Sequence, residues 1–467
     1  MGCPQYAGDL ERLMGGTRRP TGHGVLMIVA VSGMAILASV SAAGPAAARM
    51  ASGKALSVHP GARRWVSTYT GPGAHDDFAD SVAVAPRGGA VYVTGSSSSA
   101  TGVADFATVG YDASTGARLW ASRYDGARGA GGDAQAVAVD PAGRTVFVTG
   151  YGPGHGSGTD YVTIAYNAAT GSRLWLSRYN GPASSDDYAY AVAVSPDGRT
   201  VFVTGSSQGG PAATAGDYAT VAYDAATGAQ LWASRYSGPG SSEDVATSLA
   251  VAPDGATVYV TGGSGSDYAT VGYDAATGAQ QWVNRQQAGY ARSIAVSPGG
   301  QAVFVTGTDG LVFATVGYDA ATGAQQWVSH YNGAGRSGSR ASSLAVSPGG
   351  GMVYVTGAAA LDYATVAYSA ATGALRWARR YHGPADSGAR QVAVGPRGRT
   401  VYVTGGIGRD FATVAYIAAT GSPRWVSRYP GSGISLAVSP VSGTVFVTGF
   451  TRRAASFRDF ATIAYHG

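Results

Sequence analysis

The sequence has very little cysteine, lysine and charge. Among its 467 residues there is one cysteine, Cys3, and one lysine, Lys54, and only 13% of the residues are charged. A single cysteine excludes a disulfide within the chain and a zinc site built on several thiolates. The low charge also excludes an intrinsically disordered chain, which combines high charge with few apolar residues.

The positive charge balance has little functional meaning. The formal net charge is +5, nearly all the cations are arginines, and basic residues form no long run. An excess of Arg, Ala, Gly and Pro is typical of a GC-rich genome, so composition bias explains the basic character. We therefore predict no nucleic-acid partner, because such a partner needs a basic surface interleaved with aromatic side chains.

Residues 1–48 differ from the rest of the chain. Arg18 and Arg19 precede an apolar stretch over residues 24–43, and three small residues, 46–48, follow it. This order is typical of a secretory signal peptide, so we predict a leader over 1–48, a linker over 49–60 and a secreted, extracytoplasmic protein. The alternative is an uncleaved membrane anchor, because about 20 apolar residues can span a bilayer.

Three short patterns recur eight times in constant order. The first, V-[YF]-V-T-G, begins at Val91, Val146, Val201, Val258, Val303, Val353, Val401 and Val445. The second is a tryptophan, at Trp65, Trp120, Trp175, Trp232, Trp282, Trp327, Trp377 and Trp425. The third, [FY]-[AV]-T-[VI]-[AG]-Y, ends at Tyr111, Tyr166, Tyr223, Tyr273, Tyr318, Tyr368, Tyr416 and Tyr465. Such self-similarity is the signature of a repeat architecture.

Each repeat predicts four short β-strands, which we name A to D. In the third repeat they lie near residues 192–194, 201–204, 218–223 and 230–236, and the last of them carries the tryptophan. β-Branched and aromatic residues fill these segments, and turn residues separate them. A four-stranded unit of about 50 residues, repeated eight times, predicts an all-β, eight-bladed β-propeller over residues 61–467.

The ends of the repeat region predict how the ring closes. The region starts with a lone D-type strand around Trp65 and ends just after a C-type strand at Tyr465. We therefore expect the N-terminal strand to complete the last blade, which leaves no spare sheet edge. The middle residue of every A strand is alanine, as at Ala193, and a small side chain suits the crowded inner strand.

One segment of each unit resembles a known repeat. In the third unit, residues 222–232 fit the pattern A-x-D-x-x-T-G-x-x-x-W. This pattern is similar to the tryptophan-docking repeat of pyrroloquinoline quinone (PQQ) type propellers, and the wider unit resembles the SBBP-type β-propeller repeat of bacterial extracytoplasmic proteins. The resemblance covers residues 61–467. It implies a propeller of eight blades that is either a quinoprotein dehydrogenase or a non-catalytic scaffold for other proteins.

The sequence departs from the enzymes among these propellers. Quinoprotein alcohol dehydrogenases usually carry a vicinal disulfide and a tryptophan under the cofactor, and often a lysine beside the quinone. Here Cys3 and Lys54 lie outside the ring, and every tryptophan occupies a repeat position. We therefore expect no cofactor and no catalysis. PQQ or calcium in an oxidoreductase with a degenerate site is the alternative.

Function is expected on the face that carries the D–A and B–C connections. The A–B and C–D turns on the other face are short and uniform, whereas binding usually involves variable loops on a rigid scaffold. The longer B–C loops fall in units 8, 1, 2 and 3, which become neighbours when the ring closes. A binding rim and neutral drift among repeats explain this arc equally well.

Paired acids in the D–A loops are the candidate metal ligands. Asp76 with Asp77, and Asp186 with Asp187, offer the hard oxygen ligands that Ca²⁺ prefers. The alternative, which we favour, is that each aspartate caps its own loop by accepting hydrogen bonds from backbone N–H groups.

Eight residues at the mouth of the central channel break the uniformity of the repeats. They are Asp80, Gln135, Tyr190, Thr247, Arg292, Ser342, Arg390 and Ile434. Only unlike residues can make an asymmetric pocket, so a central ligand would be recognised here, with Asp80 opposite Arg292 as the most polar pair. With the loop acids, the candidate binding residues are Asp80, Gln135, Tyr190, Arg292, Arg390, Glu243 and Asp244.

Two further features concern structure and catalysis. The aspartate before each C strand recurs whatever the loop length, so we expect a structural role, and Val312 replaces it once with no other change. No nucleophile with a dedicated base is visible. His75 and His155 are the only histidines in the long loops, and no Gly-x-Ser-x-Gly elbow occurs.

These observations favour a secreted, monomeric, non-catalytic propeller that binds a protein or glycan partner on its loop-bearing face. The alternatives are a PQQ- or calcium-dependent oxidoreductase and another extracytoplasmic enzyme, a lyase or hydrolase, that uses polar residues at the channel mouth. A membrane contact is expected only if the N-terminal segment is retained.

Overall fold

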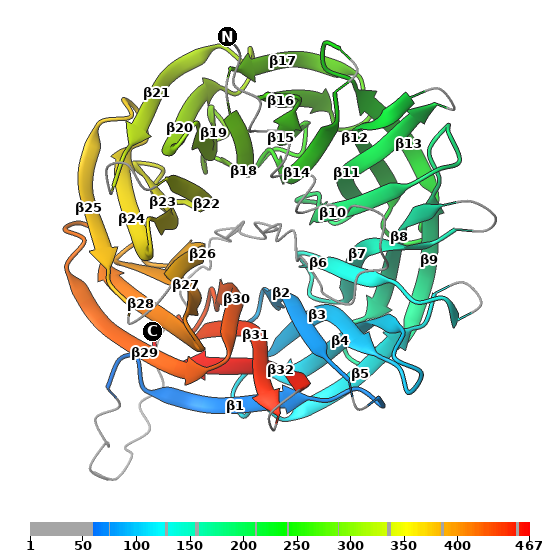
Figure 1. Ribbon diagram of the computed structural model, residues 1–467, viewed down its shortest axis with the longest axis horizontal. Helices are drawn as coiled ribbons and strands as arrows, with labels where there is room; N and C mark the ends of the chain where they lie inside the picture. Colours follow the sequence, from blue (N-terminus) through cyan, green and yellow to red (C-terminus); the bar gives the residue numbers. More distant parts are fainter. Residues whose placement is uncertain are drawn as a thin grey trace, which may run out of the picture.

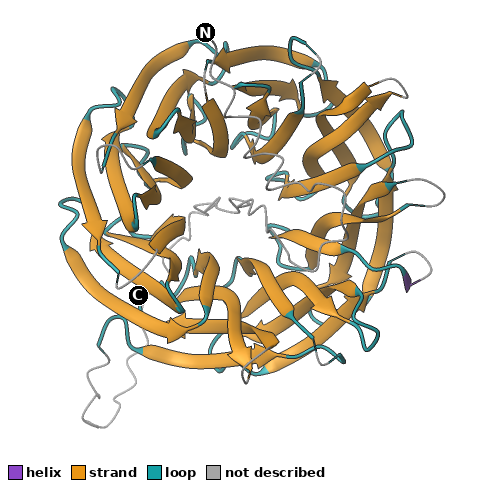
Figure 2. Cartoon of the chain, viewed as in Figure 1, coloured by secondary structure: helices purple, strands orange, loops and turns teal. Residues whose placement is uncertain are grey.

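The described part of the chain forms a closed ring of β-sheets. The computed structural model describes residues 59–73, 75–126, 129–154, 158–210, 213–240, 242–287, 289–333, 338–383, 387–453 and 457–467. Their strands, β1 to β32, make eight antiparallel four-stranded sheets arranged like the blades of a propeller (Figure 1, Figure 2). The predicted all-β, eight-bladed propeller is therefore confirmed.

Within each blade the strands follow the chain outwards from the central channel. Blade 1 contains β2 (Asp77–Val84), β3 (Ala90–Ser98), β4 (Ala104–Asp112) and β5 (Arg118–Tyr124); blade 2 contains β6 (Asp133–Val139), β7 (Thr145–Pro153), β8 (Thr159–Asn167) and β9 (Arg173–Tyr179). Blade 3 contains β10 (Asp187–Val194), β11 (Thr200–Gly210), β12 (Ala213–Asp224) and β13 (Gln230–Tyr236); blade 4 contains β14 (Asp244–Val251), β15 (Thr257–Ser264), β16 (Asp267–Asp274) and β17 (Gln280–Gln286). Blade 5 contains β18 (Gly289–Val296), β19 (Ala302–Asp309), β20 (Val312–Asp319) and β21 (Gln325–Tyr331); blade 6 contains β22 (Ser339–Val346), β23 (Met352–Ala359), β24 (Asp362–Ser369) and β25 (Leu375–Tyr381). Blade 7 contains β26 (Ser387–Val394), β27 (Thr400–Ile407), β28 (Asp410–Ile417) and β29 (Pro423–Pro430).

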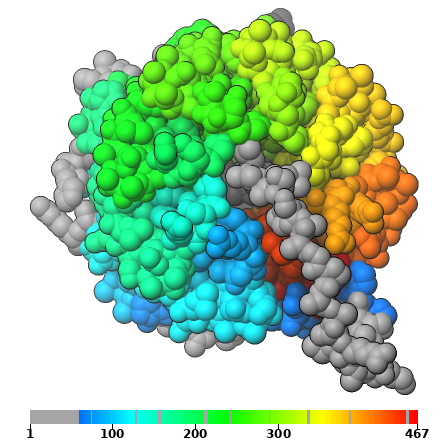
Figure 3. Space-filling model, turned by 180° about the vertical axis from the view of Figure 1, so that it is seen from behind, coloured from blue at the N-terminus to red at the C-terminus, as the bar shows by residue number. Residues whose placement is uncertain are grey.

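The eighth blade joins the two ends of the described chain. It consists of β30 (Ser432–Val438), β31 (Val445–Arg453), β32 (Phe457–Tyr465) and, as its outer strand, β1 (Arg63–Tyr69). Strand β1 pairs antiparallel with β32, and the Gly61 amide donates to the His466 carbonyl. The N-terminal strand therefore closes the ring, as predicted, and the blades follow one another around the disc in chain order (Figure 3).

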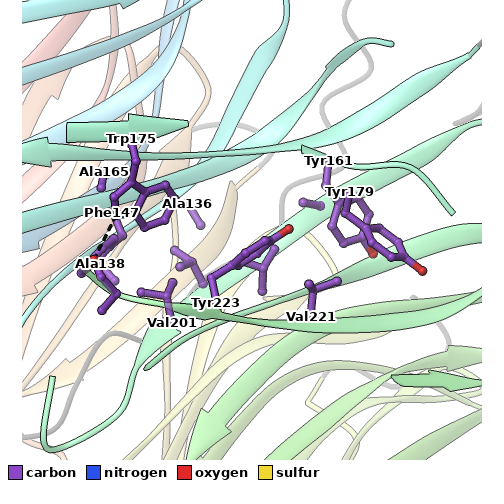
Figure 4. Packing of buried hydrophobic residues seen from close by; sticks show 14 of the residues in the cluster. Ala136, Ala138, Phe147, Tyr161, Ala165, Trp175, Tyr179, Val201, Val221 and Tyr223 are labelled. Atoms are coloured by element: carbon purple, nitrogen blue, oxygen red, sulfur yellow. Dashed lines mark hydrogen bonds between the residues drawn. The ribbon is translucent and has the colours of Figure 1, made fainter. Parts of the chain in front are cut away.

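The repeated tryptophan joins each blade to the next. The indole Nε1 of Trp175 in blade 2 donates to the Ala225 carbonyl in the C–D turn of blade 3, and the ring packs near Phe147 and Tyr223 (Figure 4). The same bond recurs at six other junctions. Eight buried apolar clusters, one between each pair of neighbouring blades, also take in the alanine in the middle of each A strand.

The V-T-G pattern holds strands A, B and C together. Its threonine bonds the threonine of the C strand in all eight blades, as Thr204 does with Thr220 at 2.9 Å. Its glycine is required by a close approach, since a Cβ on Gly205 would lie 1.9 Å from the Tyr188 carbonyl oxygen. This close approach accompanies a β-bulge in the neighbouring A strand.

The aspartate before strand C has the expected structural role. Asp217 forms an ion pair with Arg235 of the outer strand at 2.8 Å, and four other blades repeat this pair. The prediction that Val312 replaces the aspartate with no other change was wrong. Blade 5 also lacks the arginine, and His330 stands in its place and contacts Asp309 at 2.9 Å. Both partners have changed because a carboxylate and a guanidinium stabilise each other only as a pair.

The ring has two unlike faces. The D–A and B–C connections form what we call the loop face, and the A–B and C–D turns form the turn face. Among the described residues no helix has the length and apolarity needed to cross a membrane. The predicted leader over 1–48 lies outside the described residues, and so does His155.

Candidate functional site

The eight residues predicted at the channel mouth share one backbone feature. Each is the extra residue of a β-bulge in its A strand, where the pairing register with the B strand shifts. For Tyr190 the shift falls between Ala189 and Ala191. A bulge leaves its extra residue unpaired and turns the side chain out of the regular pleat. These positions are therefore free to differ from blade to blade.

Three tyrosines from two neighbouring blades form a cluster at the mouth. Tyr151 directly follows the V-[YF]-V-T-G pattern in β7, and Tyr188 and Tyr190 lie on β10. The ring centroid of Tyr151 is 4.9 Å from that of Tyr188 and 6.3 Å from that of Tyr190, and both contacts are edge-on. Val245 of β14 packs against this tyrosine cluster, in which Tyr190 is buried and the other two rings are partly exposed.

A fourth tyrosine extends the aromatic surface towards blade 5. Tyr290 lies across Gly263 of blade 4, where a Cβ would be 2.2 Å from the ring. The guanidinium of Arg292 sits over the Tyr290 ring at 4.9 Å from its centroid. This contact shows that the tyrosine surface of the mouth can hold a guanidinium group.

The charges of three carboxylates act on the aromatic residues. Burial and the charge of Asp133 raise the pKa of Asp80 well above its ordinary value, although the Arg390 guanidinium opposes the shift. Desolvation and the neighbouring Asp244 raise the pKa of Glu243. Asp80, Asp133 and Glu243, which we call the mouth carboxylates, also raise the pKa values of the cluster tyrosines, after the larger effect of burial.

Asp80 of blade 1 and Arg292 of blade 5 lie four blades apart, on opposite sides of the ring (Figure 1), and they are not each other's electrostatic partners. The cation that acts on Asp80 is Arg390, and burial lowers the pKa of Arg390. Arg292 instead contacts Tyr290. Gln135 is partly buried on the inner strand of blade 2, which also carries Asp133. Blades 1 to 5 therefore contribute the tyrosines and carboxylates of the mouth.

The second acid of each pair accepts hydrogen bonds from the backbone of its own loop. The carboxylate of Asp77 accepts hydrogen bonds from the Gly71 and Ser98 amides, and Asp187 and Asp244 accept equivalent bonds from the amides six residues before them. All three are buried. They are loop caps, because each carboxylate accepts a hydrogen bond from at least one backbone N–H group of its own loop.

The first acid of each pair reaches a neighbouring blade. Asp76 accepts from the Arg458 amide and lies 3.6 Å from its guanidinium, and Asp186 accepts from the Thr159 amide. The pair Asp76 and Asp77 belongs to blade 1, and the pair Asp186 and Asp187 belongs to blade 3. No group of three potential metal ligands occurs among the residues that the structure describes.

Sequence reasoning missed Tyr151, Tyr188 and Tyr290. Tyr188 and Tyr290 occupy a position that holds Phe78, Asp133 or Val245 in other blades, and Tyr151 occupies one that holds small residues in most. Non-uniformity among the repeats was the signal used to find the bulge residues. The same signal, applied to the two positions beside the bulge, would have found these tyrosines.

The site combines π faces with carboxylates whose charges act on them. Aromatic faces attract cations through the ring quadrupole, and carboxylates add a charge of the opposite sign. The arrangement is suited to an arginine or lysine side chain or another organic cation.

Comparison with known proteins supports a propeller family. The family model described as outer membrane protein assembly factor BamB matches three overlapping stretches, residues 42–210, 192–315 and 217–455. No curated protein matches the chain by sequence. The matched stretches cover nearly all of the ring.

Many solved propellers share the architecture. Sqt1 of Chaetomium thermophilum, bound to the N-terminus of the ribosomal protein L10, has a TM-score of 0.58 and 15% identity and covers 84% of this chain and 98% of its own. The C-terminal WD40 domain of Sif2 has a TM-score of 0.58 and 12% identity over 88% of this chain and 99% of its own. The quinohemoprotein alcohol dehydrogenase ADHIIG of Pseudomonas putida has a TM-score of 0.58 and 15% identity over 87% of this chain and 76% of its own. At these identities the likeness shows the fold alone.

Proposed function

Since this eight-bladed ring belongs to the family of the outer membrane protein assembly factor BamB, within the PQQ-like propellers, we propose that it is a binding module for a protein partner. Its loop face takes up a cationic segment of that partner at the tyrosine cluster. The protein acts outside the cytoplasm, after export directed by residues 1–48, and it catalyses no reaction.

One observation carries this proposal. Tyr151, Tyr188 and Tyr190 meet at the channel mouth, and the charges of Asp80, Asp133 and Glu243 act on them. A guanidinium or ammonium group in this place gains both cation–π and ionic attraction. The Arg292–Tyr290 contact beside it shows the same chemistry within the chain.

The quinoprotein alternative finds less support in the residues. PQQ is a flat tricarboxylate, which needs cations and an exposed aromatic surface beneath it. The mouth carboxylates would repel it, and seven of the eight tryptophans donate their Nε1 hydrogen to the next blade. The described residues therefore do not fit PQQ.

The proposal is tested by peptide binding. A fluorescent peptide of alternating arginine and glycine is titrated with the protein, and the same peptide with neutral citrulline serves as the reference ligand. Tyr188→Leu should weaken binding of the arginine peptide about tenfold, because a partly desolvated cation–π contact contributes roughly 1–2 kcal/mol. Glu243→Gln should also weaken it, and more strongly at low salt.

Matched variants elsewhere on the ring give the controls. Tyr429→Leu changes a partly buried tyrosine of blade 7, and Asp254→Asn changes an exposed acid on the turn face. Neither should affect the affinity. Equal binding of the citrulline peptide, or equal losses in the control variants, would contradict the proposal. Tighter binding of a neutral oligosaccharide would instead favour the glycan partner, and saturable binding of PQQ with Ca²⁺ the oxidoreductase.

A further inference from the structure

A second ring of variable residues lies on the turn face. The residue immediately before each tryptophan is exposed, and each is the extra residue of a β-bulge in its outer strand. In chain order these residues are Arg64, Leu119, Leu174, Leu231, Gln281, Gln326, Arg376 and Arg424. Leucine occupies blades 1 to 3, glutamine blades 4 and 5, and arginine blades 6 to 8.

Contacts place these side chains beside the A–B turns. Arg424 donates to the Thr400 hydroxyl and Arg64 to the Thr444 hydroxyl, and each threonine lies just after the A–B turn of the same blade. Leu119 lines a shallow cavity of about 270 Å³ together with turn residues such as Gly89 and Gly143. The ring of variable residues therefore belongs to the turn face, opposite the tyrosine cluster.

Blades 6 to 8 make one uninterrupted basic sector of this face. Arg64, Arg376 and Arg424, which we call the arginine arc, come from three consecutive outer strands. Arg397 and Arg399 in the A–B turn of blade 7 are exposed beside them. None of the described A–B or C–D turns of these three blades contains an acidic residue.

The residue that caps the C–D turn is acidic in blades 1, 3, 4 and 5 and is not acidic in blades 6 to 8. In blade 1 the C–D turn is capped by Asp112, which accepts hydrogen bonds from Ser114 and Thr115, and blades 3, 4 and 5 carry the equivalent cap. Blades 6, 7 and 8 have Ser369, Ile417 and His466 at this position. The side chain of Ile417 cannot accept these hydrogen bonds, so the C–D turn of blade 7 lacks the stabilising cap. An aspartate at this position would place a negative charge beside the arginine arc.

The preceding part of the chain joins the ring at this same sector. The described chain starts at His59 and enters β1 of blade 8 at Arg63. The sequence carries no acidic residue from 12 to 75, and its apolar stretch over 24–43 is separated from the ring by residues 44–58. Fifteen residues reach at most about 50 Å when extended. A retained apolar segment would thus hold blade 8 near the membrane that contains it.

We propose that the arginine arc docks the blade 6–8 edge of the turn face onto an anionic phospholipid surface. Guanidinium groups bind phosphate through paired N–H donors, and several arginines act together on a surface of many headgroups. The acids of the turn face lie in blades 1 to 5, so the ring meets the membrane tilted, with those blades lifted. When the leader is retained, it and the arc together supply the two signals that stable attachment needs.

The test is co-sedimentation with vesicles. Residues 49–467 are used, because they contain all 32 strands. Vesicles of phosphatidylcholine with phosphatidylglycerol should bind the protein at low salt and release it at high salt, and pure phosphatidylcholine vesicles should bind little. Arg64→Gln/Arg376→Gln/Arg424→Gln should weaken binding by about a hundredfold, since each arginine near such a surface strengthens it about fivefold.

Two further variants separate the proposal from a general charge or folding effect. Arg118→Gln/Arg173→Gln removes two exposed arginines from the outer strands of blades 1 and 2 and should leave binding unchanged. Ile417→Asp/Ser369→Asp should restore the turn caps, raise the thermal midpoint and still weaken vesicle binding about tenfold or more.

Four results would overturn the proposal. They are equal losses in the blade 1 and 2 variant, salt-independent binding to neutral vesicles, full competition by soluble glycerol phosphate, and tighter binding of single-stranded DNA than of vesicles. The last two would show a phosphate pocket or a nucleic-acid surface in place of a membrane contact.

Discussion

The strongest quantitative prediction concerns the tryptophan that joins neighbouring blades. Trp175 donates to the Ala225 carbonyl at 3.0 Å, whereas the Nε1 of Trp425 at the seam of the ring has no partner among the described residues. Both indoles pack against two aromatic rings at similar distances. Replacement of either by phenylalanine removes the same atoms from between two aromatic rings, and only the Trp175→Phe change breaks a hydrogen bond.

The difference between these two variants therefore isolates that bond. A buried hydrogen bond contributes about 1 kcal/mol, and an acceptor left without its partner adds to the loss. We expect Trp175→Phe to lower the free energy of unfolding by about 1–2 kcal/mol more than Trp425→Phe. Urea unfolding followed by circular dichroism measures both values. Equal losses, or a larger loss for Trp425→Phe, would refute the role assigned to the indole N–H.

The other predictions concern single charges. Asp80→Asn should stabilise the protein at pH 7. The wild type loses stability as the pH rises from the ordinary aspartate pKa of about 4 towards the raised pKa of Asp80, because the buried carboxyl group must then ionise. Urea unfolding should therefore show a gain in the free energy of unfolding at pH 7 and no gain at pH 4. Cation binding to the wild type should for the same reason strengthen as the pH rises through the pKa of Asp80, which a pH series of the peptide titration measures. Asp112→Ala should cost about 1 kcal/mol and Ile417→Asp should recover a similar amount for its own turn. The hydrogen bonds from Ser and Thr side chains lower the pKa of Asp112 to about 2, so its contribution should be complete above about pH 4 and be lost as the pH falls through the lowered pKa. Val312→Asp alone should destabilise blade 5, and His330→Arg in addition should restore about 1 kcal/mol in a double-mutant cycle; additive effects would show that no pair forms.

The fold was predictable because the recurring residues make the same contacts in all or nearly all of the blades. Trp175 reaches Ala225 of the next blade, and Thr204 bonds Thr220 of the next strand. Gly205 allows the bulge that would otherwise clash with it. Because the sequence carries eight copies of each of these residues, it predicts a ring of eight blades. The order of the patterns at the two ends of the repeat region also predicts how the ring closes.

The site was predictable only in part. The bulge residues, such as Asp80 and Tyr190, could be found because they differ among repeats. Their interactions were harder to assign: the sequence pairs Asp80 with Arg292 across the ring, whereas the arginine that acts on it is Arg390 of blade 7, two blades away around the closed ring. The acid pairs show the opposite limit. Asp77 looks like a ligand in the sequence, and only the loop geometry shows that its oxygens hold the Gly71 and Ser98 amides.

The most direct test of the account is a crystal structure of the protein with the arginine peptide. We expect an arginine side chain at the channel mouth, with its guanidinium within about 6 Å of the Tyr188 or Tyr151 ring centroid and close to Glu243. A peptide bound elsewhere on the ring, or a mouth left empty at saturating peptide, would contradict the claim that the tyrosine cluster and the mouth carboxylates form the binding site.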